Sequence, residues 1–245
     1  MDSYILENIK LIEDRMAKAC KEFNRDAKEV KLLMATKTVD PEKIKLALSS
    51  GHTLIAENRI QELKEKFLPL QEINHINHFI GHLQTNKVKE LLRYEVTCLH
   101  SVDRVDLAEK LQARLERENK TLEVLLQVNT SKEESKFGVD PMDAITLCRS
   151  VAALRNLKIK GLMTIGLFSD DKVKVEACFK RLASIRDQIK EAQIPGVEMN
   201  ELSMGMSGDL ELAIKHGATI IRVGTAIFGK RSTPDSFYWN EGAKL

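Results

Sequence analysis

The chain contains 245 residues, of which 43% are hydrophobic and 30% charged, and its formal net charge is only +2. A nucleic-acid-binding protein concentrates positive charge, so this balance argues against nucleic acid as a partner. The sequence contains no apolar run of about 18 residues, the length that a membrane span requires. The composition therefore predicts a protein with a substantial core and no membrane partner.

The four cysteines, Cys20, Cys98, Cys148 and Cys178, lie far apart and form no CxxC pair. Such sparse use is typical of a reducing compartment rather than of a disulfide framework. The N-terminal segment mixes charges with apolar residues and so does not resemble a signal peptide. These features predict a cytoplasmic protein.

The first predicted element is an N-terminal helix, because its apolar residues recur at three- and four-residue steps. They are Ile5, Ile9, Ile12, Met16 and Ala19. Eight short apolar runs then alternate with amphipathic stretches, which predicts eight strands separated by helices. The runs span residues 31–37, 53–58, 77–82, 96–102, 123–129, 159–165, 198–204 and 219–224.

Strands that alternate with helices predict a parallel sheet. An open doubly wound sheet is the competing architecture, but no GxGxxG motif follows the first strand. About 250 residues and eight strands favour a (β/α)8 barrel. We therefore predict one barrel domain over residues 1–245 with an extra N-terminal helix. Pro41 and Pro141 mark expected helix starts, and Gly51 and Gly217 mark expected helix ends.

Active sites of such barrels lie at the carboxyl ends of the strands, where this sequence places Lys37, Asn58 and Asn129. A lysine that ends an apolar strand points into a partly desolvated mouth. Desolvation lowers the pKa of the amine and so favours attack on an aldehyde. The competing interpretation is a lysine that extends to solvent.

The loop LSMGMSGD, residues 202–209, is a candidate phosphate cradle because glycines let backbone amides approach an anion. Ser207 is expected to cap the helix that follows. Gly224 and Thr225 could add an amide and a hydroxyl. The competing interpretation is a pair of ordinary turns. Arg222 lies in an apolar strand and needs a partner, either a ligand ring nitrogen or a structural ion pair.

His75, His78 and His82 suggest a metal site at first sight. On a strand, however, His75 and His78 face opposite sides. No matching carboxylate or cysteine cluster is evident in the pattern, so we predict no metal.

Eight segments resemble the YggS/PROSC family of pyridoxal phosphate homeostasis proteins. They are MATKTVD, AENRIQE, HFIGHLQTNK, HSVDR, QVNTSKEESKFG, GLMTIG, ELSMGMSGD and IRVGTAIFG, and they extend from about Lys31 to Gly229. Lys132 stands where the family commonly has glycine, and Gly208 where an acidic residue is frequent. Neither departure affects Lys37.

The resemblance implies a fold-type III barrel like the N-terminal domain of alanine racemases, with pyridoxal 5'-phosphate held as a Schiff base on Lys37. It implies that Ser207, Gly224 and Thr225 hold the phosphate, with Ser203 as a weaker candidate. It places Arg222 at the pyridine nitrogen, and Asn58 and Asn129 along the other face of the cofactor.

Two functions compete, a carrier for pyridoxal phosphate and an amino-acid racemase. A two-base racemase needs a proton donor on each face of the substrate carbon. Lys37 serves one face, but none of Tyr4, Tyr94 and Tyr238 ends a predicted strand. The sequence therefore favours a non-enzymatic carrier, expected to be monomeric, that supplies apoenzymes dependent on the cofactor.

Overall fold

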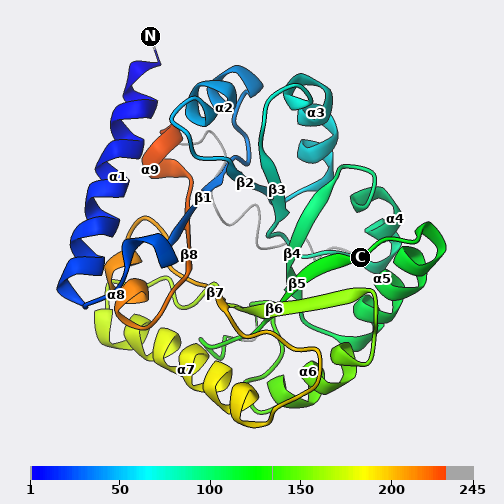
Figure 1. Cartoon of the computed structure of the whole chain (residues 1–245). Coiled ribbons are helices and arrows are strands. Elements are labelled where there is room, and N and C mark those ends of the chain that lie inside the picture. Colours follow the sequence, from blue (N-terminus) through cyan, green and yellow to red (C-terminus); the bar gives the residue numbers. More distant parts are fainter. Residues whose placement is uncertain (1, 134, 230–245) are drawn as a thin grey trace.

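The computed structural model describes residues 2–133 and 135–229. Within these residues, eight parallel strands close into one barrel in chain order, surrounded by helices (Figure 1). The strands are β1 (Lys31–Ala35), β2 (Leu54–Glu57), β3 (Ile76–Phe79), β4 (Val96–Val102), β5 (Leu122–Gln127), β6 (Leu157–Met163), β7 (Glu201–Ser203) and β8 (Ile220–Val223). The predicted (β/α)8 architecture is confirmed.

The helices lie between successive strands, with one before the barrel and one after the last strand. They are α1 (Ser3–Glu22), α2 (Pro41–Leu48), α3 (Ile60–Leu70), α4 (Val88–Leu91), α5 (Val105–Glu118), α6 (Ala144–Ala152), α7 (Lys172–Glu191), α8 (Leu210–Lys215) and α9 (Thr225–Phe228). Two short 3₁₀ turns, Ala27–Glu29 and Thr85–Lys87, complete the described elements. None of the helices among these residues is long and apolar enough to cross a membrane.

Strand alternation divides the apolar residues into two cores. In β1, Leu32 and Met34 belong to the large core between the strands and the helices. Leu33 belongs to a smaller core inside the barrel. The smaller core comprises Leu33, Ala56, Cys98, Leu125, Met163 and Ile220. The barrel interior is therefore filled by side chains, and a ligand has to bind at its mouth.

The predicted N-terminal helix is confirmed as α1, and its apolar stripe is buried. This helix packs against α2, α8 and α9 beside the junction of β1 and β8 (Figure 1). Arg15 of α1 donates hydrogen bonds to the Glu211 carboxylate and to the Ser207 carbonyl. The extra helix thus contacts the loop that was predicted to bind phosphate.

The predicted helix boundaries are partly correct. Pro41 is the first residue of α2, and the Asp40 carboxylate accepts a hydrogen bond from the Glu42 amide at 2.9 Å. Gly51 and Gly217 follow helices with φ of 96° and 91°, as expected of left-handed positions. Pro141 does not begin a helix, because residues 141–143 form a turn and α6 starts at Ala144.

Candidate functional site

The predicted site residues lie at one end of the barrel, because parallel strands in chain order have their carboxyl ends at the same edge. Lys37 follows β1 and Asn58 follows β2, whereas Arg222 lies within β8. Strands β1 and β8 are adjacent, with Leu33 paired to Arg222 and Met34 to Val223. Lys37 and Arg222 therefore project from neighbouring strands into the same mouth.

The Lys37 side chain lies in a protected position, since the residue is only 9% exposed. The alternation of β1 directs Leu33 inward, and Lys37 lies in the turn that follows the end of this strand. The prediction of a partly desolvated lysine at the mouth is consistent with this placement. The alternative of a lysine extended into solvent is not what the structure shows.

Arg222 is buried, and hydrogen bonds from its guanidinium hold the side chain in place. Nη1 donates to the Ser203 hydroxyl at 3.0 Å, and Nη2 donates to the Thr164 carbonyl at 2.9 Å. Burial lowers the pKa of Arg222 to about 10, and the Asp209 carboxylate opposes this shift. The guanidinium therefore stays charged near neutral pH.

Behind Arg222 a chain of hydrogen bonds crosses the barrel. The Ser203 hydroxyl lies 3.0 Å from Nδ1 of His100, and Nε2 of His100 lies 2.8 Å from Nδ1 of His78. Burial lowers the pKa of His100 well below its usual value, and His78 and Arg222 reinforce the shift. We call His78, His100, Ser203 and Arg222 the arginine network. It holds one permanent cation and two neutral imidazoles.

The sequence argument against a metal site did not consider two residues that lie beside His78. Cys98 and His100 of β4 lie beside it, and one ligand-type atom from each of the three residues lies within 4.8 Å of the others. The expected separation of His75 from His78 is consistent with the structure, since His75 contacts the Ile73 carbonyl instead. Because the two imidazoles already bond to each other, we assign them to the arginine network.

Asn58 has a buried side-chain oxygen, Oδ1, without a hydrogen-bond partner. The loop after β3 passes very close to it, because a Cβ atom on Gly81 would lie 1.9 Å from the Asn58 carbonyl oxygen. Only glycine permits this approach. Gly81 therefore fixes the backbone that carries Asn58 at the mouth.

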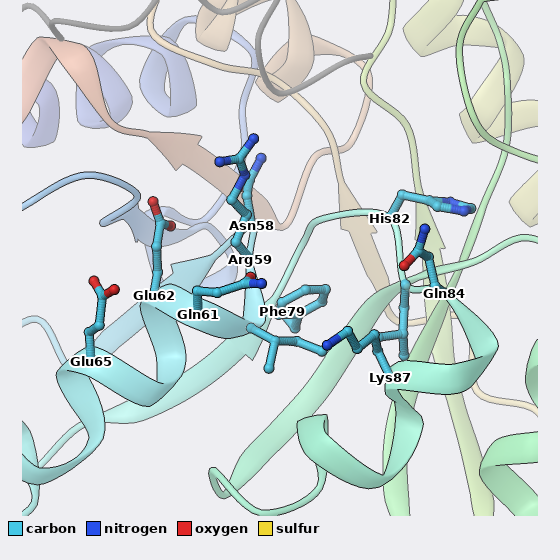
Figure 2. Close-up of a pocket in the computed structure, with 11 residues that line it drawn as sticks. Asn58, Arg59, Gln61, Glu62, Glu65, Phe79, His82, Gln84 and Lys87 are labelled. Atoms are coloured by element: carbon cyan, nitrogen blue, oxygen red, sulfur yellow. The ribbon is translucent and has the colours of Figure 1, made fainter. Parts of the chain in front are cut away.

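A cavity of about 590 Å³ opens beside Asn58, between α3 and the segment that follows β3. Figure 2 shows Arg59, Glu62 and Glu65 on one side of it, with His82 and Lys87 on the other. Of the predicted cofactor residues, Asn58 alone is among those that line it.

Asn129 is engaged in its own loop. Its side-chain nitrogen donates to the carbonyls of Glu133 and Lys136, and its oxygen accepts from the Ser131 hydroxyl. These bonds shape the segment after β5. The prediction that Asn129 lines the cofactor stays a prediction, and the geometry shows a loop-building role beside it.

Ser207 lies in the loop after β7, and Gly224 and Thr225 lie at the start of α9, directly after β8. The expected helix cap by Ser207 is wrong, because Asp209 is the cap residue of α8. The Asp209 carboxylate accepts a hydrogen bond from the Met206 amide at 2.6 Å. Asp209 therefore shapes the loop, which leaves the Ser207 hydroxyl without a capping task. The buried Ser203 hydroxyl is bonded within the arginine network, which favours a supporting role over phosphate contact.

Sequence reasoning did not assign a role to three buried charged residues behind Lys37. They are Glu57 of β2 and Glu62 and Lys66 of α3. A signal was present, because Lys66 lies within the apolar stripe of α3 between Leu63 and Leu70. A charge at such a position needs a buried partner.

The barrel and its mouth define a class. A family model described as "Alanine racemase, N-terminal domain" matches residues 13–232. An alanine racemase from Clostridium difficile has the same fold with a TM-score of 0.71 at 14% identity, over 91% of this chain and 58% of that one. The chain is a barrel of the alanine racemase N-terminal type.

Within that class, curated relatives identify the family. A pyridoxal phosphate homeostasis protein of Aquifex aeolicus is 40% identical over 92% of this chain and 97% of its own length. The Haemophilus influenzae protein of the same name is 38% identical over 93% and 96%. The chain belongs to the family of pyridoxal phosphate homeostasis proteins.

Solved structures agree with this assignment. A protein of unknown function from Bifidobacterium adolescentis superposes with a TM-score of 0.86 at 40% identity, over 92% of this chain and 94% of that one. PipY of Synechococcus elongatus, solved with pyridoxal phosphate bound, gives a TM-score of 0.77 at 30% identity. That match covers 87% of this chain and 100% of PipY.

Proposed function

We propose that this protein binds pyridoxal 5'-phosphate through Lys37 and takes part in homeostasis of the cofactor by holding and releasing it. The observation that carries the proposal is Lys37 itself, which is 9% exposed and lies two residues after β1, the strand that pairs with the strand of buried Arg222. Family membership and the ligand bound to PipY support the choice of cofactor.

The donor set of the mouth fits this ligand. The Lys37 amine can condense with an aldehyde, forming a carbon–nitrogen double bond as one water leaves. Ser207 and Thr225 offer hydroxyls, and Gly224 permits close backbone approach to a phosphate. Asn58 brings a buried oxygen that has no partner within the described structure. The bound group would supply electrophilic carbonyl chemistry.

Arg222 favours a carrier over an enzyme. Its guanidinium stays charged near neutral pH, since the pKa is lowered only to about 10. A cation beside the pyridine nitrogen disfavours protonation there, and an unprotonated ring withdraws electrons weakly. Arg222 therefore provides binding and orientation with little support for carbanion chemistry.

The second candidate function, a racemase, needs an acid on the face opposite Lys37. The Tyr4 hydroxyl donates to the Phe228 carbonyl at 3.3 Å, and Tyr94 packs edge-on against Phe67. Tyr238 lies outside the described residues. We therefore favour a non-enzymatic protein, and we extend the proposal to a cytoplasmic monomer that supplies apoenzymes.

The test of the anchor is the visible spectrum of the protein mixed with pyridoxal phosphate. Lys37→Ala should abolish the absorbance of the covalent adduct, whereas Lys136→Ala, in the loop after β5, should retain it. Borohydride reduction and peptide mapping should place the label on Lys37. Label on Lys136 or Lys87 would refute the assignment.

The phosphate contacts are tested by Ser207→Ala combined with Thr225→Ala. Each charge-assisted hydrogen bond contributes about 1.5–3 kcal/mol. Affinity for pyridoxal phosphate should therefore fall by at least about tenfold. Pyridoxal, which lacks the phosphate, should lose much less affinity, and equal losses for the two ligands would exclude the phosphate role.

The carrier and racemase functions separate in deuterated water. Exchange of the α-proton of L- and D-alanine is measured with the loaded protein and with Lys37→Ala. The carrier proposal expects exchange far below about one turnover per second. Lys37-dependent exchange at that rate or faster would establish the racemase instead.

A further inference from the structure

Three charged side chains are buried together behind the lysine-bearing segment. Glu57 is 1% exposed, Lys66 6% and Glu62 9%. Burying charges costs free energy unless they are paired and hydrogen-bonded. Glu57 does not face the barrel interior, because it lies on the outer side of β2, opposite to the inward-facing Ala56.

The cluster binds the residue before Lys37. Lys66 Nζ donates to Glu57 Oε1 and to the Thr36 carbonyl, each at 2.7 Å. The Thr36 hydroxyl donates to Glu57 Oε1 at 2.6 Å. The cluster therefore binds both the carbonyl and the hydroxyl of Thr36.

The cluster also binds the residue after Lys37. Glu62 Oε1 accepts a hydrogen bond from the Thr38 amide at 3.0 Å. Thr38 has a φ of 62°, a left-handed conformation that a β-branched residue adopts only when its surroundings impose it. Its hydroxyl donates to the Lys37 carbonyl at 2.6 Å. The backbone on each side of Lys37 is thus fixed by α3.

Burial favours the protonated form of the Glu57 carboxyl. Two carboxyls face one ammonium, and the second oxygen of each carboxyl, Oε2, is buried without a donor. Burial raises the pKa of Glu57 to about 8, with Lys66 opposing the shift and a hydrogen bond to the Glu62 carboxyl adding to it. Two carboxyls can share a hydrogen bond only when one of them holds a proton.

We propose that Glu57, Glu62 and Lys66, which we call the lysine clamp, position Lys37 for reaction with an aldehyde by holding Thr36 and Thr38. They are positioning residues, because they act on Lys37 through its neighbours Thr36 and Thr38. This inference rests on the proposed function, because it takes Lys37 as the anchor. The competing role is purely structural, in which the clamp only fastens α3 to the barrel.

The first test measures how fast adduct absorbance develops when pyridoxal phosphate is mixed with the protein. Lys66→Met and Glu62→Ala should slow this by about tenfold to a hundredfold, since a misplacement of about 1 Å has effects of that size. The matched control Lys64→Met, exposed on the same helix, should react at the wild-type rate. If clamp variants are less stable but react as fast as wild type, the role is only structural.

The second test asks whether a conservative substitution of Glu57 keeps the rate of adduct formation that a truncation loses. Glu57→Gln keeps one oxygen for Lys66 and Thr36 and offers an N–H toward Glu62, as a protonated carboxyl does. It should react clearly faster than Glu57→Ala. Equal rates for the two variants would overturn the clamp. Since Glu57→Gln preserves size and hydrogen bonding, it also covers the case in which Lys66→Met fails to fold.

The third test uses the ligand-free protein and so does not depend on the anchor. The charged groups facing Glu57 are Lys66 and Glu62 of α3, with Thr36 of β1 neutral. A raised pKa means that the folded state binds a proton that the unfolded state has lost. The contribution of Glu57 to stability is therefore full below about pH 4.5 and is lost as the pH rises toward about 8.

Glu57→Gln should remove this decline from the free energy of unfolding. An unchanged pH profile would mean that Glu57 is not buried among the clamp residues as the structure has it, and would overturn the clamp. If instead Lys37→Ala still forms the adduct while Glu57→Gln flattens the profile, the anchor is wrong and the buried clamp stands. The two failures are thus distinguishable.

Discussion

The lysine clamp and the arginine network support two residues of the same mouth by opposite means. Lys37 is positioned through the backbone of Thr36 and Thr38. Arg222 is positioned through its own guanidinium, which donates to Ser203 and to the Thr164 carbonyl. The difference follows from what each residue is proposed to do. Lys37 is the proposed covalent anchor, and the clamp holds the backbone on each side of it, whereas Arg222, which acts by charge, is held through its own side chain.

The two regions also differ in charge. The clamp gathers three buried ionisable groups, and burial raises the pKa of one of them, Glu57, to about 8. The arginine network carries one cation beside imidazoles whose pKa values burial lowers. Single substitutions can distinguish the two regions by their effect on the free energy of unfolding. We expect the clamp to depend on charge and the arginine network to depend on hydrogen bonds.

The largest expected effect is that of Arg222→Met. The change removes the N–H groups that donate to the Ser203 hydroxyl and to the Thr164 carbonyl. Buried polar groups that lose their hydrogen-bond partners lower the free energy of unfolding. We expect the free energy of unfolding, measured in urea, to fall by roughly 2–4 kcal/mol. Arg149→Met, exposed on α6, should change it by less than about 0.5 kcal/mol. A loss as small as in this control would mean that Arg222 does not hold the barrel interior together.

The acid side of the pH profile tests the arginine network in the direction opposite to the clamp. Burial lowers the pKa of His78 from 6.5 to about 4, with Lys31 adding to the shift and Glu201 opposing it. The unfolded state therefore binds a proton at His78 more readily than the folded state does. The contribution of His78 is full above about pH 6.5 and is lost as the pH falls toward about 4.

His78→Leu should therefore flatten the acid side of the profile and leave the alkaline side unchanged. Glu57→Gln should do the reverse. Chemical denaturation at a series of pH values measures both sides, and His52→Gln on the surface is the control. A variant that altered both sides equally would show that the clamp and the network are not independent.

The sequence predicted the barrel well because alternating short apolar runs and helical stripes are local patterns. It also placed Lys37, Arg222, Ser207 and Thr225 at the correct strand ends, since strand order fixes that edge. The arginine network was beyond reach, because His100 and Ser203 are 103 residues apart and their contact depends on barrel closure. The Ser207 cap failed for a local reason, because Asp209, two residues later, occupies the N-cap position of α8.

The lysine clamp can be predicted from the sequence only in part. Glu62 and Lys66 are four residues apart and share one helix face, so the sequence shows that a charged pair enters an apolar stripe. Their targets, Thr36 and Thr38, lie 30 and 24 residues earlier and become neighbours only when α3 packs on the barrel. A buried charge can thus be suspected from periodicity, whereas its partner has to come from the fold.

The smallest expected effect compares one hydroxyl from each network. Thr36→Val removes the donor to Glu57 Oε1, but Lys66 still occupies that oxygen, so the free energy of unfolding should fall by only about 0.5–1.5 kcal/mol. Ser203→Ala leaves both Arg222 Nη1 and His100 Nδ1 without their partner, so the loss should be nearer about 1–3 kcal/mol. Urea denaturation of both variants at one pH measures the difference. If Thr36→Val proved the more destabilising, the Thr36 hydroxyl would contribute more than one shared acceptor explains, and Glu57 would depend on it rather than on Lys66 for its position.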